Sequence, residues 1–293
     1  MTTQANSISA IDFLIFMEHP GSLSSIIDEY YTIVSRQEVK ALSSSNHTMH
    51  EEQENSCTRI IRFLHCRVKL NGNRNVLNAN YVDGYEHKRK YISTRSPSEN
   101  NTDKYLQMVW DKNVKIIVVP SRSENKVNFH QYWSSNKGAV IECAKFQIET
   151  LEVTTKPHYV LSLLILTNQK GRTHRISHFE YTAWPVDSFC HDRKAFLDVV
   201  SNINELYTYL EKHKSSNDFG PMIVHCIDGS NSAGVFCVVD TCVTEFKKTG
   251  MLSISSTVKK MRQQIYGSMN RLNDYVFCYR LLHVYVKYEM VMY

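Results

Sequence analysis

Hydrophobic positions follow a helical period near the N-terminus of the chain. They fall at Leu23, Ile26, Ile27, Tyr30, Tyr31 and Val34. This spacing places the apolar side chains on one face, so an amphipathic helix is predicted over residues 23–41. A polar stretch rich in Ser, Asn and Glu, residues 43–56, separates that helix from the next patterned segment of the chain.

The middle of the chain carries mainly strand patterns. Residues 67–70 and 80–82 are β-like, a helix is predicted around 103–110, and the unbroken β-branched run 115–119 is typical of a fully buried strand. Several further strands are predicted between residues 139 and 181.

Helical patterns dominate the last third of the chain, at residues 193–212, 233–248, 255–264 and 273–289. Strands in the middle with helices on both flanks predict an α/β (α+β) fold around one central, mixed, twisted sheet. We expect residues 1–21 to form an N-terminal extension and residues 22–293 to form a single domain.

One segment joins an apolar strand pattern to an apolar helix pattern through a tight loop that begins with Cys226. The loop runs through Gly229 and Asn231 to Ser232 before the helix starts. A strand–loop–helix of this kind directs backbone N–H groups and a helix N-terminus at one point, where an anion can bind. The same surroundings lower the pKa of a thiol, so Cys226 is a candidate nucleophile.

Composition and charge narrow the possible functions. The 293 residues, 42% of them hydrophobic, suffice for one large core, and the formal net charge is only +5. Short basic clusters such as residues 87–90 are interpreted as solvated loops, so no nucleic-acid binding is expected.

The cysteines and the lengths of the apolar runs indicate the cellular compartment in which we expect the protein. The eight cysteines form no CxxC pair, no signal peptide is recognised, and the longest apolar run, 159–166, is far too short to span a bilayer. We expect a reduced, cytoplasmic protein without stable membrane insertion. His174 and His178 would share a helical face, but their surroundings predict a strand, so no metal and no cofactor is expected.

Several segments, in order along the chain, resemble the framework motifs of the classical protein-tyrosine phosphatase domain. They are Arg67-Val68-Lys69-Leu70, residues 78–85, Met108-Val109-Trp110, Gln131-Tyr132-Trp133, residues 178–185, His225-Cys226 with Gly229 and Gly234, and Tyr275 with Phe277. The resemblance covers nearly the whole chain and implies the family's fold, with Cys226 at the position of its nucleophile and Gly229 and Asn231 lining its phosphate site.

Two residues of the cysteine loop depart from the family pattern. The resemblance puts an arginine, which forks onto two phosphate oxygens, at the position of Ser232. A serine offers one neutral hydrogen bond and no charge. Asp228 occupies a position where the family has a small neutral residue, and a carboxylate beside the thiolate opposes both a bound dianion and the ionisation of the thiol. The alternative is that its side chain points outward into solvent.

The acid loop departs as well. Where the family has Trp-Pro-Asp, this chain reads Trp184-Pro185-Val186-Asp187. Valine cannot protonate a leaving oxygen, a contribution worth roughly 10²–10⁴-fold in rate. Asp187 could replace the missing acid only if the loop shifted by one residue.

Three further positions of the resembling site are changed. Counted back without gaps from Arg67, the tyrosine that stacks on the substrate ring is replaced by Cys57. The lysine that contacts the acid loop is replaced by Asn128, and the glutamine that positions water is replaced by Asn270. These departures fall on the site, while the packing motifs stay readable.

The chain therefore resembles a pseudophosphatase, and as a free-standing domain with an eroded site it is similar to the phosphatase-like proteins carried by the bracoviruses of parasitoid wasps. That resemblance implies a monomer in the host cell cytoplasm that binds host signalling proteins, tyrosine-phosphorylated ones among them, and suppresses immune responses. A scaffold is favoured over a phosphotyrosine trap because Ser232, Asp228 and Cys57 all weaken phosphate and ring binding. A weak phosphatase using Cys226 and Asp187 is the alternative, and a redox-sensitive Cys226 ranks last.

Overall fold

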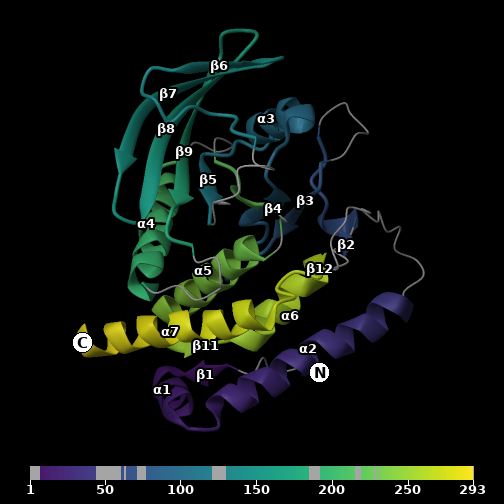
Figure 1. Cartoon of the computed structure of the whole chain (residues 1–293), viewed down its shortest axis with the longest axis vertical. Helices are drawn as coiled ribbons and strands as arrows, with labels where there is room; N and C mark the ends of the chain where they lie inside the picture. Colours follow the sequence, from purple (N-terminus) through teal and green to yellow (C-terminus); the bar gives the residue numbers. More distant parts are fainter. Residues whose placement is uncertain are drawn as a thin grey trace.

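The computed structural model describes residues 7–43, 61–62, 64–70, 77–120, 130–184, 192–214, 219–227, 229 and 231–292. Its main feature is a central sheet, drawn in teal and blue in Figure 1, with helices on both sides. No helix in these ranges is both long and apolar enough to cross a bilayer.

Within the described residues, the central sheet has eight strands in the order β3-β4-β10-β5-β9-β8-β7-β6. In that order they are Ala79–Val82, Tyr91–Arg95, Met222–Cys226, Ile116–Val119, Thr173–Tyr181, Tyr159–Asn168, Phe146–Thr155 and Val140–Cys143. The strands β4, β10, β5 and β9 run parallel to one another, and the outer pairs are antiparallel. The predicted mixed sheet is thus confirmed, and the strand that leads to Cys226 is the third in this order.

Both faces of the sheet are covered, which explains the unbroken apolar strands. In β5, Ile116 and Val118 join one core with the helices α4 (Arg193–Lys212), α5 (Ser232–Thr249) and α7 (Leu272–Met292). Ile117 joins a second core with α3 (Thr102–Asp111). Side chains alternate between the two faces of a strand, so a strand buried on both sides needs apolar residues at every position. The predicted buried strand at residues 115–119 is confirmed.

The helices agree closely with the periodicity of the sequence. They are α1 (Ala10–Glu18), α2 (Ser22–Ser43), α3 (Thr102–Asp111), α4 (Arg193–Lys212), α5 (Ser232–Thr249), α6 (Ile254–Gln264) and α7 (Leu272–Met292), with short 3₁₀ turns at Leu64–Cys66 and Glu99–Asn101. The side chain of Asp192 caps α4 by accepting a hydrogen bond from the Ala195 N–H, and α5 ends at Gly250 with φ of 69°. Two short strand pairs, β1 (Ile8–Ser9) with β11 (Met251–Leu252) and β2 (Ile61–Arg62) with β12 (Ile265–Tyr266), complete the described fold.

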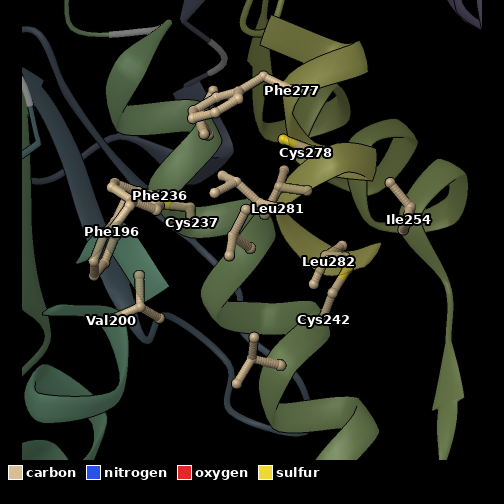
Figure 2. Close-up of a cluster of buried hydrophobic side chains, with 14 of the residues drawn as sticks. Phe196, Val200, Phe236, Cys237, Cys242, Ile254, Phe277, Cys278, Leu281 and Leu282 are labelled. Atoms are coloured by element: carbon tan, nitrogen blue, oxygen red, sulfur yellow. The ribbon is translucent and has the colours of Figure 1, made fainter. Parts of the chain in front are cut away.

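The larger core lies between α4, α5 and α7, as Figure 2 shows with Phe196, Phe236 and Leu281. Helix α1 was not foreseen, although its Phe13 is fully buried and lies against Tyr279 of α7. The boundary predicted after residue 21 stays a prediction, but this helix of the extension shares the core of the domain (Figure 1).

Two local predictions differ from the structure. Residues 67–70 do not form a strand: Arg67 makes an isolated bridge to Asn80, and no strand extends from it over these described residues. The interpretation of residues 87–90 as a solvated loop is wrong for Lys90, which is 3% exposed. Its Nζ lies 2.6 Å from Oδ2 of the fully buried Asp240 in α5 and donates to Asn204 as well. Lys90 is therefore part of the core.

Candidate functional site

The cysteine loop lies at the carboxyl end of β10, an inner strand of the sheet. Strand β10 ends at Cys226 and is paired on both sides, with β4 and with β5, while α5 begins at Ser232. The carboxyl ends of parallel strands are where open α/β sheets bind ligands. Cys226, Gly229, Asn231 and Ser232 are thus brought together as the sequence predicted, and the exposure of the three side chains ranges from 2% for Cys226 to 7% for Ser232.

Hydrogen bonds tie this loop to β4 and to the segment after that strand. The Cys226 carbonyl accepts from the Ser96 N–H at 2.9 Å and from the Gly229 N–H at 3.1 Å. The Ser93 hydroxyl donates to the Gly229 carbonyl at 3.1 Å. Gly229 has φ of 70°, a left-handed conformation that favours glycine. Because its N–H is engaged inside the loop, that amide is not offered to an anion.

Ser232 is the first residue of α5 and stands where the resemblance expects an arginine. It is 7% exposed, and its short side chain carries no charge. The positive potential at this position comes from the helix N-terminus, roughly half an elementary charge spread over the first turn. The site can attract an anion weakly but lacks the fork that would clamp a phosphate.

A buried polar network lies beneath the loop. The Tyr132 hydroxyl is 3.0 Å from Nε2 of His225 and 3.1 Å from Nε2 of His178, and it lies 3.3 Å from the Tyr105 hydroxyl. On its other side, His225 Nδ1 lies 3.0 Å from the Ser96 hydroxyl. The residue before the cysteine is therefore fixed by contacts at both ring nitrogens.

Burial keeps the two histidines of this network neutral. Desolvation lowers the pKa of His225 to about 3. Desolvation, with a smaller contribution from His225, lowers the pKa of His178 well below its usual value. Neither imidazole supplies a positive charge that could stand in for an arginine at Ser232.

The same burial predicts a pH dependence of stability. The pKa of His225 is lower in the folded chain than in the unfolded chain, near 6.5, so the unfolded chain takes up protons first as the pH falls. We expect the free energy of unfolding to be constant above pH 6.5 and to fall toward pH 3, by roughly 1.4 kcal/mol per pH unit for this group. Denaturant titrations between pH 4 and 8 measure it, and a His225→Gln variant with an unchanged slope would contradict the assignment.

Asn270, at the position of the water-positioning glutamine, is held by its backbone. Its carbonyl accepts a hydrogen bond from the hydroxyl of Tyr30 in α2, and the neighbouring Met269 lies against Gly234 in the first turn of α5. Glu29, also in α2, accepts hydrogen bonds from the hydroxyls of Tyr275 and Tyr279 in α7. Helix α2 thus contacts both the Asn270 carbonyl and the start of α7, and it holds the segment that carries Asn270 in place.

We predict that Glu29→Ala lowers the free energy of unfolding by about 1–3 kcal/mol, because two buried phenol hydroxyls lose one shared acceptor. Guanidinium titration measures this. Asp28→Ala is the matched control, since Asp28 is exposed on the same helix. An equal effect of the two substitutions would show that the contacts of Glu29 contribute nothing specific.

Five of the predicted site positions have no structural description. Cys57, Asn128, Val186, Asp187 and Asp228 lie outside the described residues. Their roles stay sequence predictions.

Two serines that position the loop were not foreseen from the sequence. Ser93 is fully buried in the middle of β4, where the apolar pattern is interrupted by a hydroxyl, and Ser96 follows the same strand. A buried polar residue within a core strand requires a partner, and that was the available signal. Tyr132 was recognised only as part of a framework motif, not as the centre of the network.

Comparison with known proteins agrees with this geometry. The family model for protein-tyrosine phosphatases matches residues 51–283. The chain is 82% identical over 216 residues to tyrosine phosphatase-like protein J3 of Microplitis demolitor bracovirus, a match that covers 74% of this chain and 86% of that protein.

Two other relatives extend the comparison. Probable tyrosine phosphatase protein J2 of the same virus is 53% identical over 287 residues, covering 98% of this chain and 97% of the relative. Human tyrosine-protein phosphatase non-receptor type 9 is 31% identical over 221 residues, which cover 73% of this chain and 37% of the human protein. With the matching motifs, the central mixed sheet and the cysteine loop between β10 and α5, the chain belongs to the protein-tyrosine phosphatase family.

Proposed function

We propose that this protein is a catalytically inactive member of its family, a virus-encoded binding or scaffold factor that interferes with host phosphotyrosine signalling, including immune signalling. The observation that carries the proposal is Ser232 at the start of α5, buried and uncharged where the phosphate clamp belongs. Loss of one preorganised donor to transition-state charge costs roughly 10²–10³ in rate, and loss of a bidentate cation costs at least as much.

Other substitutions point the same way. Val186 at the acid position provides no proton for the leaving group, and Asn270 is one methylene shorter than the expected glutamine. In the sequence, Asp228 puts a carboxylate two residues after Cys226, where the family resemblance expects a small neutral residue. The histidine network does not compensate, because burial keeps His225 and His178 neutral.

A scaffold accounts for the geometry better than a phosphotyrosine trap. A trap needs an open cradle of amides and an aromatic to stack on the ring. Here Cys226 is 2% exposed, the Gly229 N–H donates to the Cys226 carbonyl, and position 57 is a cysteine. The partners we propose are host signalling proteins. We propose that the protein acts as a monomer in the host cytoplasm, and that it neither binds nucleic acid nor inserts into a membrane. The bracovirus relatives support the viral setting.

Calorimetry with phosphotyrosine peptides tests this version of the function. For a scaffold we expect no binding tighter than about 10 µM, roughly −7 kcal/mol, and no difference from the same peptides without phosphate. Tighter, phosphate-dependent binding that is weakened by Gly229→Asp would overturn the scaffold and establish the trap.

A weak phosphatase is the second candidate, favoured by the presence of Cys226 at the start of the loop that leads into the 18-residue helix α5. It would use Cys226 as nucleophile and Asp187 as acid. It requires a phosphocysteine intermediate and turnover that disappears in Cys226→Ser. Turnover of a phosphotyrosine substrate that is equal in the natural chain and in Cys226→Ser excludes it.

A further inference from the structure

A cavity of about 290 Å³ lies away from the cysteine loop, between the turn after β3, the middle of α5 and the first turns of α6. It is just below the size of ordinary small-molecule sites, about 300–1,000 Å³, and suits one or two side chains. None of the residues assigned above to the cysteine site or its positioning contributes to its lining.

Its inner wall is apolar. Val82 from the end of β3, Cys237 and Val238 from α5, and Met261 from α6 line it, and all four are at most 3% exposed. Figure 2 shows Cys237 on α5 among the side chains of the larger core. A hydrocarbon stem would be desolvated against this wall, which stabilises binding in proportion to the area buried.

Three carboxylates are among its polar lining residues. Asp83, Glu86 and Glu245 line the cavity against a single lysine among the lining residues, Lys260. Glu245 is already used, since its two oxygens accept from the N–H and the hydroxyl of Ser253. Asp83 Oδ1 accepts from the Arg89 N–H at 2.8 Å, so Oδ2 of Asp83 and the carboxylate of Glu86 are the acceptors that can meet a cation from outside.

Both of these carboxylates are paired with exposed lysines of the chain itself. Lys260 Nζ lies 3.4 Å from Asp83, and Lys248 Nζ lies 2.6 Å from Glu86, with lysine side chains 56% and 46% exposed. Ion pairs of this kind contribute little and exchange easily. Lys248 Nζ also lies 5.8 Å from the ring centre of Tyr85, so the mouth already accommodates a cation over an aromatic face.

We infer that this cavity is a docking site for an arginine side chain of a partner protein, with an apolar residue next to it. The guanidinium would replace the two lysines on Asp83 and Glu86 and stack on Tyr85, while its stem lies on Val238 and Met261. A planar fork suits two neighbouring carboxylates and an aromatic face better than an ammonium does. The inference rests on the proposed binding role and identifies this cavity as the surface that would bind the partner.

The experiment uses the full chain with ¹³C-methyl methionine. The Met261 signal, one of ten methionines, is assigned by its loss in Met261→Leu. The probe is acetyl-Leu-Arg-Leu-amide, and its control replaces arginine by citrulline, which keeps the shape and removes the charge. We expect a saturable Met261 shift with the arginine peptide and at least about tenfold weaker binding of the citrulline peptide.

Replacing the carboxylates of Asp83 and Glu86 by amides of the same shape tests their role in binding the guanidinium. Asp83→Asn with Glu86→Gln is expected to weaken the arginine peptide about tenfold or more. Asp198→Asn with Glu205→Gln, which removes the same charge from exposed positions of α4, is expected to change nothing. Equal binding of the citrulline peptide to the natural chain would overturn the inference even if the variant at Asp83 and Glu86 failed to fold.

Agmatine separates a protein partner from a free small amine. It carries the guanidinium head without flanking residues, and we expect it to bind at least about tenfold more weakly than the peptide, because it buries less apolar surface. Equal affinity would overturn docking of a protein segment in favour of a small organic cation. The phosphotyrosine calorimetry does not involve this cavity, so failure of the arginine site and failure of the scaffold proposal are distinguishable.

Discussion

Replacing Ser232 by arginine together with Val186 by aspartate is expected to give phosphatase turnover roughly 10³-fold or more above that of the natural chain. The arginine restores the cation for transition-state charge, worth roughly 10²–10³, and the aspartate restores the acid, worth roughly 10²–10⁴. The two act in one step, so their effects are not simply multiplied. Hydrolysis of a phosphotyrosine peptide, followed by phosphate release, measures the change.

The control for this experiment is the same double variant with Cys226→Ser, which must abolish any restored turnover. The two single variants separate the clamp from the acid, and adding Asp228→Ala removes the charge of the wrong sign. If the double and triple variants are both inactive, loss at these positions does not explain inactivity. The loop held by Ser93 and Ser96 would then itself be unable to bind phosphate.

Replacing Lys90 by methionine is expected to lower the free energy of unfolding by about 3–5 kcal/mol. The substitution leaves the fully buried Asp240 without its cation, and an uncompensated charge in the core is costly. The Tyr91 hydroxyl and Asn204 still donate to Asp240, but neither neutralises it. Guanidinium or thermal unfolding of the two proteins at pH 7 measures the difference.

Two further variants make this result specific. Lys248→Met removes a lysine whose pair with Glu86 is equally short but exposed, and we expect no measurable loss of stability from it. Lys90→Met combined with Asp240→Leu should recover much of the loss, because no buried charge is then left at this position. A loss for Lys90→Met no greater than for Lys248→Met would contradict the burial of the pair.

Elements with a strong period could be predicted from the sequence, and these make up most of the fold. Helix α4 was predicted at its observed bounds and α2 within a few residues, because one apolar face repeats over many turns. Helices α5 and α7 were also predicted within a few residues, although both are buried on most sides, because their apolar patterns are long. Residues 67–70 have a strand pattern, yet among the described residues they form only the single bridge at Arg67. Helix α1 is apolar on several sides, so its pattern showed no period.

Lys90 shows why burial of a charge could not be predicted. It follows three charged or polar neighbours and looks like part of a solvated cluster. Its burial depends on Asp240, which is distant in sequence and comes close only when β4 packs on α5. The hydrophobic pattern of a sequence predicts which apolar residues are buried, but it does not predict which charged residues form ion pairs inside the core.

At the site, the sequence identified the residues that belong to a motif, but it did not identify the residues that contact the loop only through the packing of distant segments. Cys226 and Ser232 were located by their positions in one loop, and the structure places both at the junction of β10 and α5. The contacts of Ser93, Ser96 and Tyr132 to that loop come from strands and segments far apart in the chain. Their roles required three-dimensional neighbours.

The position of β10 between β4 and β5 determines when this protein can finish folding. During synthesis β4 and β5 emerge long before β10, which must then insert between them, so two open strand edges wait for a partner. The last helix must also be complete before Glu29 can meet Tyr275, 246 positions away. Such non-local topologies fold slowly and are exposed to aggregation until the chain is released. A cell that produces this protein therefore needs chaperone capacity in proportion to its abundance, whether or not the cysteine loop performs any chemistry.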